Sequence, residues 1–193
     1  MDEVSSISQL VLRERQGRGL GLWDQLRDCY HPDSHVTTSW FDGTGPEFVE
    51  VSEAGHLPGR RVVNRLSPPV VQQTDDRAVV ELPSTTTHWF VMGEVEALLT
   101  SYMRLIYRVE RRDEVWRIVS LGAINQADTL DPAVPGVSLD IDQELLGTFR
   151  WSYRHLCYRA ALQKMTVPDD LPGDDRPEEA AAFLRSIFAW LER

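Results

Sequence analysis

The stretch "LWDQLRDCYHPDSHVTTSWFDGTGPEFVE", Leu22 to Glu50, carries in direct succession the signals of a helix, a strand, a tight turn and a second helix. Leu22, Leu26 and Tyr30 share one face of the first helix, which we expect to stop at His31 because the residue before a proline resists helical dihedral angles. The following "HVTTSWF" is rich in β-branched and aromatic residues and therefore predicts a strand. The turn "DGTG" ends that strand.

The two aromatic residues before the turn need a burial site. We expect Trp40 to wall an internal cavity and Phe41 to pack on the reverse face, since neighbouring side chains of a strand point to opposite sides. Pro46 suits the first turn of the next helix, which we expect to end at Gly55. A short helix upstream is predicted from apolar residues at helical spacing, with Ser5 or Ser6 as its N-cap and the glycine-rich "GRGLG" (17–21) as its end.

Beyond the third helix, the chain contains three long strand-like runs, at 61–92 with a turn at "TDD", at 96–110 and at 115–126, with "RRDE" as a hairpin loop between the last two. Three helices followed by a meander of long antiparallel strands predict an α+β fold, in which the N-terminal helices pack on one face of a cone-shaped, curved antiparallel sheet. The helices do not fill such a cone, so we expect a cavity.

Composition excludes several classes of function. The chain has 193 residues, is 42% hydrophobic and carries a formal net charge of -10, which argues against a nucleic-acid groove or an anionic membrane surface as the partner. The amino terminus lacks a basic segment followed by an apolar run, and no stretch approaches the roughly 20 apolar residues of a membrane span. We therefore expect a cytoplasmic protein. Cys29 and Cys157 are expected to be buried thiols.

Strand alternation predicts which side chains share a face. His88 lies with Thr86 and Ser84 on one face of its strand, but alternation does not say whether that face is the core or water. In the next strand Tyr107 belongs to the apolar series and is expected to point inward, whereas Tyr102 belongs to the polar series. In the last strand one side is expected to carry Trp116, Ile118, Ser120, Gly122 and Ile124.

The layout and three stretches together carry a family resemblance. These stretches are 22–50, "LTSYMRLIYRVERRDEVWRIVSL" (99–121) and "LDPAVPG" (130–136). They are similar to the nuclear transport factor two-like superfamily and, within it, to the SnoaL-like proteins, over roughly Ser5 to Pro135. Members of that superfamily include polyketide cyclases, scytalone-type dehydratases, ketosteroid isomerases, epoxide hydrolases and silent binding or dimerisation modules. The resemblance implies a cystatin-like cone with a cavity more firmly than it implies a reaction.

The residues that such enzymes use for proton chemistry are partly replaced here. The resemblance implies a Tyr and an Asp near the junction of the first two helices, where this chain has Glu14 and Gly19, and a His on the strand after the third helix, where it has Asn64. His88 is then the main candidate acid/base, because a neutral imidazole can take a proton from a carbon next to a carbonyl near physiological pH. A hydrogen-bonded strand histidine is the alternative.

Other residues are expected to assist. Asn64 is a candidate donor to a developing enolate oxygen, and Glu81 or Glu14 a candidate base or orienting group if burial raises its pKa. Each has a structural alternative as a satisfied or exposed polar side chain. The candidate substrate-binding residues are Trp40, Tyr107, His56, Tyr102 and Trp116, of which the aromatic rings more commonly form core.

No spacing among the histidines and carboxylates matches a metal site, and "GRGLG" lacks the Lys-Ser/Thr of a phosphate-binding loop. We therefore expect neither a metal nor a cofactor.

From Asp142 to Met165 the chain is expected to be helical, and Pro177 opens a second helix with an apolar stripe. We divide the chain into a cone-shaped domain, 1–135, and a C-terminal helical extension, 136–193, which covers the outer sheet face, the cavity mouth or a second subunit.

Two functional hypotheses follow. The first is a cofactor-independent isomerase, dehydratase or cyclase acting on a hydrophobic, oxygenated secondary metabolite of polyketide or terpenoid type, as in antibiotic biosynthesis. The second is a non-catalytic small-molecule-binding or dimerisation module, which the missing Tyr and Asp favour. The resemblance also implies a homodimer.

Overall fold

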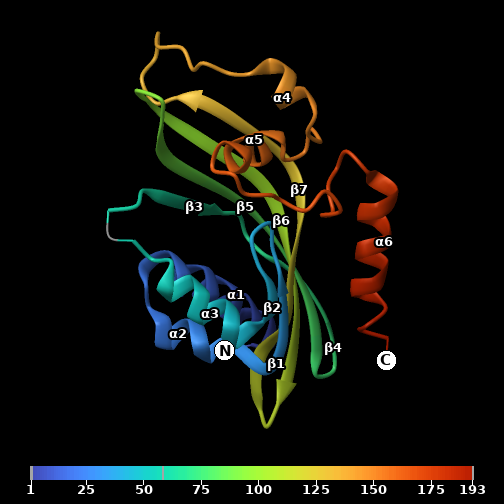
Figure 1. The fold of residues 1–193 in the computed structure, drawn as a ribbon. Helices are drawn as coiled ribbons and strands as arrows, with labels where there is room; N and C mark the ends of the chain where they lie inside the picture. The colour runs from blue at the N-terminus through green and yellow to red at the C-terminus, as the bar shows by residue number, and fades with distance from the viewer. Residues whose placement is uncertain (1, 58, 193) are drawn as a thin grey trace.

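The computed structural model describes residues 2–57 and 59–192. Within them, six helices surround one seven-stranded sheet in layers (Figure 1). Three N-terminal helices, α1 (Glu3–Leu20), α2 (Trp23–Asp28) and α3 (Gly45–Ala54), cover the concave face. Helices α4 (Gln143–Gly147) and α5 (Arg154–Leu162) lie at one end, and α6 (Pro177–Phe188) lies on the opposite face of the sheet. The predicted α+β class with a curved sheet is confirmed.

Helix α1 is longer than the sequence predicted at both ends. Asp2, rather than Ser5 or Ser6, is its N-cap and accepts a hydrogen bond from the Ser5 amide at 2.9 Å. The helix continues through "GRGL" and ends at Gly21, whose φ of 70° only glycine adopts easily. Gly17 serves packing instead of ending the helix, because an added Cβ would lie 3.3 Å from the Leu26 Cβ of α2.

The strand expected at 35–41 is displaced toward the N-terminus. Strand β1 (Tyr30–Thr37) starts directly after α2, and residues 38–41 form a turn closed by the Thr38 amide, which donates to the Phe41 carbonyl at 2.7 Å. Strand alternation therefore does not reach Phe41, and its ring packs 5.4 Å from Phe48 on the helical side instead of on the reverse face. That part of the prediction was wrong.

Helix α3 follows the short strand β2 (Asp42–Thr44) and begins as predicted. Thr44 and Glu47 form a reciprocal capping box, and Pro46 occupies the first turn, where its missing N–H costs no hydrogen bond. This strong local start fixes the helix over the concave face, where Phe48 and Val49 are fully buried.

The sheet has the order β2-β1-β7-β6-β5-β3, with β4 also pairing with β5. Strands β3 (Val62–Leu66) and β4 (Val70–Thr74) pair with successive parts of the long β5 (Arg77–Met92), and β6 (Val95–Arg112) and β7 (Val115–Pro132) complete the meander. These pairs are antiparallel, whereas β1 runs parallel to β7. The long central strands bend into the predicted cone.

A bulge in β7 overturns the predicted side-chain alternation. Val109 pairs with Ile118 and Arg108 with Ser120, so Val119 is an extra residue. Beyond this point the faces exchange: Ile118 lies in the inner core, but Ile124 lies on the outer face. The prediction of one continuous side from Trp116 to Ile124 was therefore wrong, because a bulge adds one residue to one strand and increases its bend.

The C-terminal segment covers both sides of the sheet. The single helix expected from 142 to 165 is divided into α4 and α5, because residues between them make other contacts: Arg150 pairs with Asp175 at 2.7 Å and Ser152 donates to the same carboxylate. Helix α6 buries Ala180 and Ile187 against an outer cluster that contains Val79, Ile106 and Ile124. The boundary between 135 and 136 stays a prediction. Among the described residues, no helix is long and apolar enough to cross a membrane.

The contact between α6 and β7 can be tested at Gly122. A Cβ added there would lie 2.9 Å from Cζ of Phe183, so Gly122→Ala should lower the free energy of unfolding by about 1–3 kcal/mol. The penalty should largely disappear in a Phe183→Leu background, because the clashing ring edge is gone. Urea denaturation of the four proteins measures this coupling. Gly147→Ala, at a position with open space around the added Cβ, is the matched control, and purely additive effects would contradict the contact.

Candidate functional site

A hollow of about 870 Å³ includes a cavity between the concave face of the sheet and the helices. Its inner part is lined by α1, by neighbouring residues of β3 and β5, and by α5, which lies across one end; these residues include Arg15, Arg18, Val62, Asn64, Thr86, His88, Leu156, Arg159 and Ala160. The volume also includes a part lined by Phe183 and Ile187 of α6. The hollow expected from the curved sheet is therefore present.

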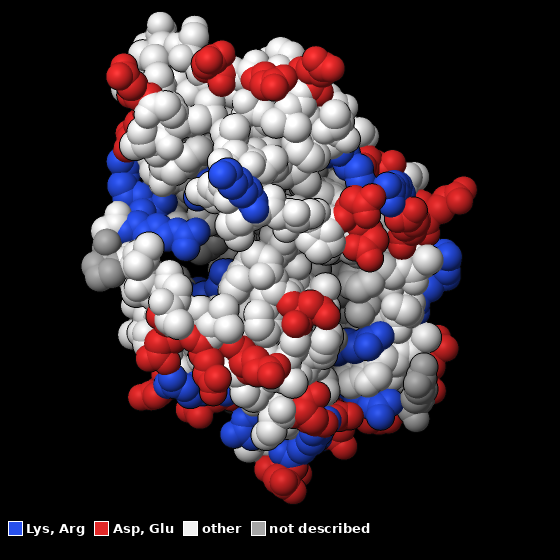
Figure 2. Space-filling model, viewed as in Figure 1, with Lys and Arg blue, Asp and Glu red and all other residues white. Residues whose placement is uncertain are grey.

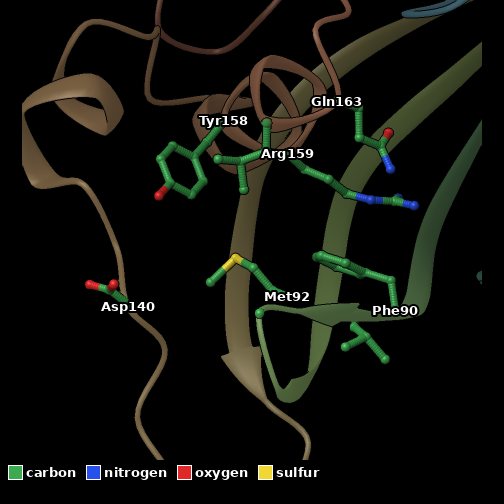
Figure 3. Close-up of a pocket in the computed structure, with 9 residues that line it drawn as sticks. Phe90, Met92, Asp140, Tyr158, Arg159 and Gln163 are labelled. Atoms are coloured by element: carbon green, nitrogen blue, oxygen red, sulfur yellow. The ribbon is translucent and has the colours of Figure 1, made fainter.

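A second pocket of about 410 Å³ lies where the tip of the β5–β6 hairpin meets α5 (Figure 3). Arg159 lines both hollows, and its guanidinium lies over the ring of Phe90 at 4.4 Å from the ring centroid. Tyr158, on the same helix, accepts a hydrogen bond from the Asp142 amide at 3.0 Å. Since Tyr158 is engaged in holding the chain before α4, the smaller pocket offers less to chemistry than the larger cavity.

His88 points from β5 to the inner face and lines the larger cavity. Its Nδ1 is enclosed by protein without a hydrogen-bond partner, which leaves Nε2 as the nitrogen that can meet a ligand. Burial lowers the pKa of His88 to about 4, and the charges of Arg159, Arg60 and Arg18 lower it in the same direction. The imidazole is thus neutral at physiological pH and able to accept a proton.

Asn64 lies beside His88 because β3 pairs with β5, placing Asn64 opposite Thr86. The Thr86 hydroxyl donates to Oδ1 of Asn64 at 2.8 Å. This bond occupies the amide oxygen and directs the Nδ2 donors elsewhere in the lining. The structure therefore brings together two of the four residues predicted to be catalytic, His88 and Asn64, on adjacent strands of one wall.

Glu14, a third candidate, is fully buried beneath the cavity and does not line it. Tyr30 and Tyr107 donate hydrogen bonds to its carboxylate at 3.0 and 3.1 Å, and Arg15 forms a two-point ion pair with it. Burial raises the pKa of both tyrosines well above the usual value. Burial alone would lower the pKa of Arg15, but the Glu14 charge outweighs it and raises the pKa. Glu14 thus holds Arg15 at the cavity wall. Tyr107 helps to fix the Glu14 carboxylate and does not line the cavity itself.

Glu81, Tyr102 and Trp116 are not among the residues that line the cavity. Glu81 and His88 are seven residues apart in β5, so strand alternation places their side chains on opposite faces of the sheet. The Glu81 carboxylate lies 3.7 Å from the Arg104 guanidinium. Tyr102 pairs with Thr85 on the same outer face and is 41% exposed. Trp116 lies at the start of β7, where it packs against the hydrophobic core that fills this end of the cone. The Arg111 guanidinium lies over its ring, 5.6 Å from the ring centroid. The site predicted from the sequence was too wide at these three positions.

Trp40 and His56 do line the cavity. Trp40 lies 5.5 Å from Phe48 and is 44% exposed, so it forms part of the mouth more than a buried wall. His56 packs edge-to-face with Trp23 at 5.3 Å. Both positions allow aromatic contacts with a ligand in this part of the cavity.

The basic lining of the cavity was not predicted from the sequence. Arg15, Arg18, Arg60 and Arg159 line the inner part of the hollow, whereas Arg108 borders the part next to α6, where it donates to the Ser186 carbonyl. None of the described lining residues is Asp or Glu. Figure 2 shows basic side chains grouped around a hollow in a surface that is acidic above and below it. Arg18 lies in "GRGLG", which the sequence suggested was a helix break, and Arg159 comes from a distant helix. Only the tertiary structure brings them together.

Metal and thiol chemistry receive no support from the described residues. Within 2–57 and 59–192, no group of three or more His, Cys, Asp or Glu is placed to hold a metal ion. Cys29 and Cys157 are buried free thiols, as expected, and burial raises their pKa values to about 12 and about 11. Both thiols are therefore protonated and unreactive at neutral pH.

Comparison with known families and sequences gives a consistent result. A family model described as a SnoaL-like domain matches residues 1–122. An uncharacterized protein of Emericella nidulans is 29% identical over 163 residues, covering 80% of this chain and 68% of that protein. Pea pathogenicity protein 2 of Fusarium vanettenii is 24% identical over 158 residues, with 80% and 68% covered. An uncharacterized protein of Aspergillus terreus is 30% identical over 172 residues, and 80% of this chain spans 64% of that relative.

Solved structures share the fold at low sequence identity. A hexachlorocyclohexane dehydrochlorinase (LinA) of type 2 has a TM-score of 0.56 and 16% identity, covering 72% of this chain and 93% of the other. A putative scytalone dehydratase from Novosphingobium aromaticivorans has a TM-score of 0.53 and 14% identity, covering 73% and 94%. An NTF2-like protein from Cytophaga hutchinsonii has a TM-score of 0.51 and 12% identity, covering 64% and 98%. At this identity the likeness establishes the fold alone.

The buried ion pair provides a stability test. Glu14→Gln should lower the free energy of unfolding by about 3–5 kcal/mol, because it leaves the buried Arg15 cation without its counter-charge. Adding Arg15→Met should restore much of the loss. Urea denaturation measures both. Glu53→Gln, which breaks the exposed pair with Arg27, is the control and should change stability by less than about 1 kcal/mol. An equally small effect of Glu14→Gln would show that the network is not needed for folding.

His88 predicts a defined pH dependence of stability. Its pKa of about 4 in the folded protein lies below the ordinary 6.5, so between these values the unfolded chain binds a proton that the folded protein does not. Stability should therefore fall as pH decreases from 7 to 5, by about 2 kcal/mol more in the parent than in His88→Gln. Urea denaturation at both pH values measures the difference, with His35→Gln, at an exposed histidine, as control. Identical slopes for parent and His88→Gln would refute the lowered pKa.

Proposed function

Because the chain belongs to the SnoaL-like domain family, as its motifs predicted, we propose that it is a cofactor-independent isomerase, dehydratase or cyclase. Its substrate is a hydrophobic, oxygenated secondary metabolite of polyketide or terpenoid type. The observation that carries this proposal is a neutral imidazole, His88, at the wall of the inner part of the hollow. This inner part offers an enclosed space for an organic molecule, and the site needs only proton transfer to be productive.

In the proposed reaction His88 acts through Nε2. The imidazole takes a proton from a carbon next to a carbonyl, and the electron pair of that C–H bond passes into an enolate. Returning the proton to another carbon completes an isomerisation with no change of mass. Giving it instead to a departing hydroxyl group completes a dehydration, in which one water is lost. One residue therefore serves as base and then as acid.

The enolate oxygen needs stabilisation, which Asn64 is placed to supply. Its Nδ2 donors remain available because Thr86 occupies the amide oxygen. Arg15 adds a fixed positive charge at the same cavity, oriented by Glu14. Preorganised donors and charges of this kind lower the barrier most effectively where water is excluded. In this proposal Glu14 is a positioning residue, Glu81 has no part, and Trp40 and His56 contact the substrate.

A non-catalytic binding module is the second candidate. It is favoured by one specific observation: among the described residues His88 has no carboxylate partner, whereas an acid/base histidine is commonly oriented by one. A pKa of about 4 also makes His88 a weak base. The two candidates share the cavity and the ligand and differ in whether His88 transfers a proton.

The homodimer and the cytoplasmic location expected from the sequence also remain proposals. Helix α6 buries its apolar stripe on the outer face of its own sheet. A second subunit is therefore not required to cover this stripe, and a dimer would use another surface.

The catalytic proposal is tested by incubating the protein with polycyclic hydroxyketones and following products by mass spectrometry. We expect either an isomer of equal mass or a product lacking one water. His88→Gln should lower kcat by at least about 100-fold, since it removes the acid/base. Asn64→Leu should lower kcat more than it changes KM. Arg13→Gln, at an exposed residue of α1, is the control. Unchanged rates in His88→Gln and Asn64→Leu would refute this mechanism, and binding without turnover in the parent would favour the second candidate.

A further inference from the structure

We propose that the ligand of the large cavity is a hydrophobic carboxylate, whose anionic group is held by Arg18 of α1 and Arg159 of α5, two residues that line the cavity together with His88. This inference names the substrate class of the site to which the proposed function assigns proton transfer. It rests on three features of the cavity: guanidinium groups without counter-ions, the absence of acidic lining residues, and apolar walls.

Arg18 is the clearest example of a guanidinium group without a counter-ion among the described residues. It lies in the last turn of α1, with its guanidinium 5.1 Å from the ring centroid of Trp40 and 5.3 Å from that of Phe48. Within the described chain it donates no hydrogen bond and has no carboxylate within ion-pair distance. Burial lowers the pKa of Arg18 to about 10, yet the group stays charged at neutral pH. A desolvated cation whose N–H donors are unused is prepared for an anion that is absent from the chain itself.

Arg159, on a different helix, presents a similar situation. It comes from α5, stacks on Phe90, and has a buried Nε without a hydrogen-bond partner. Arg60, at the rim, is close enough to lower the pKa of Arg18, of Arg159 and of His88. Three guanidinium groups from separate elements therefore act on the imidazole, and Arg60 repels the other two. An anion between them would convert this repulsion into attraction.

Arginines without a carboxylate partner are not a general feature of this protein. The formal net charge is -10, and arginines outside the cavity, such as Arg111 and Arg150, are paired with carboxylates. None of the described cavity-lining residues is acidic. Arg15 is paired with Glu14, Arg108 donates to the Ser186 carbonyl and Arg60 lies at the rim. Arg18 and Arg159 are therefore the inner cations that have no carboxylate partner within the described residues.

The walls define the rest of the ligand. Leu105, Leu121, Leu156 and Trp40 contribute apolar surface around the arginines. The planar guanidinium matches a planar carboxylate in a two-point pair, better than a small inorganic anion would fill this space. Binding would also offset the positive charges that weaken His88 as a base, so the proposed acid/base would gain basicity when the carboxylate arrives.

The experiment compares acids with their uncharged amides. Isothermal titration calorimetry at pH 7.5 is performed with three matched pairs of increasing size: 2-naphthoate, anthracene-2-carboxylate and anthraquinone-2-carboxylate, each against its carboxamide. We expect the parent to bind at least one acid more than about ten-fold tighter than the amide. Arg18→Gln and Arg159→Gln should each remove most of this preference and change amide affinity by less than about three-fold. Arg13→Gln, on the exposed side of α1, should bind both ligands like the parent.

Absence of acid preference in all three pairs, or a preference unaffected by both substitutions, would overturn the inference. Circular dichroism and thermal melting confirm that each variant is folded, and Arg159→Gln, on another helix, remains informative if Arg18→Gln does not fold. His88→Gln distinguishes this inference from the proposed reaction, because it should keep acid affinity within about three-fold of the parent while abolishing turnover. Acid preference in a parent protein that turns over no substrate would leave the inference standing and remove the catalytic proposal.

Discussion

The structure depends on one buried carboxylate, that of Glu14. It receives hydrogen bonds from Tyr30 at the start of β1 and from Tyr107 in β6, and it pairs with the neighbouring Arg15. A fully buried charge is tolerated only when it is paired and hydrogen-bonded, so α1 can dock on the sheet in one register only. The same interactions place Arg15, and one turn later Arg18, at the cavity.

The cavity is a consequence of this docking. Helices α1 to α3 fill the end of the cone that contains Phe48, Tyr107 and Ile118, but the long strands continue beyond them. The bulge at Val119 bends β7 and exchanges its faces, which gives α6 an apolar surface outside while Leu121 and Ala123 stay inside. Helix α5 then lies across the remaining opening and contributes Arg159. The charged groups enter the cavity from elements that local sequence does not connect.

The features predicted correctly from the sequence are those that depend on neighbouring residues, namely helix starts, turns and strand alternation. The capping residues and Pro46 located α3, and the turn and hairpin signals located β5, β6 and β7. Alternation placed His88 and Thr86 on one face, and the family resemblance supplied the cone. The bulge at Val119 has no signal in a run of apolar residues, and "GRGLG" reads as a break because glycine's role in packing against α2 is invisible without the partner. Glu14 was recognised as a candidate, but its role as an anchor depends on tyrosines 16 and 93 residues away.

The two proposed functions differ in a single physical quantity, the basicity of His88 when the cavity is filled. Burial and three arginines keep the imidazole neutral and weakly basic. An uncharged ligand would desolvate His88 further and leave the arginines unopposed, which favours simple binding. An anionic ligand would cancel part of that field at the same moment as it brings a C–H bond near Nε2. In the proposed mechanism, charge on the ligand is therefore the condition under which His88 becomes an effective base. The arginines that lower its pKa are the same groups that we propose to hold that ligand.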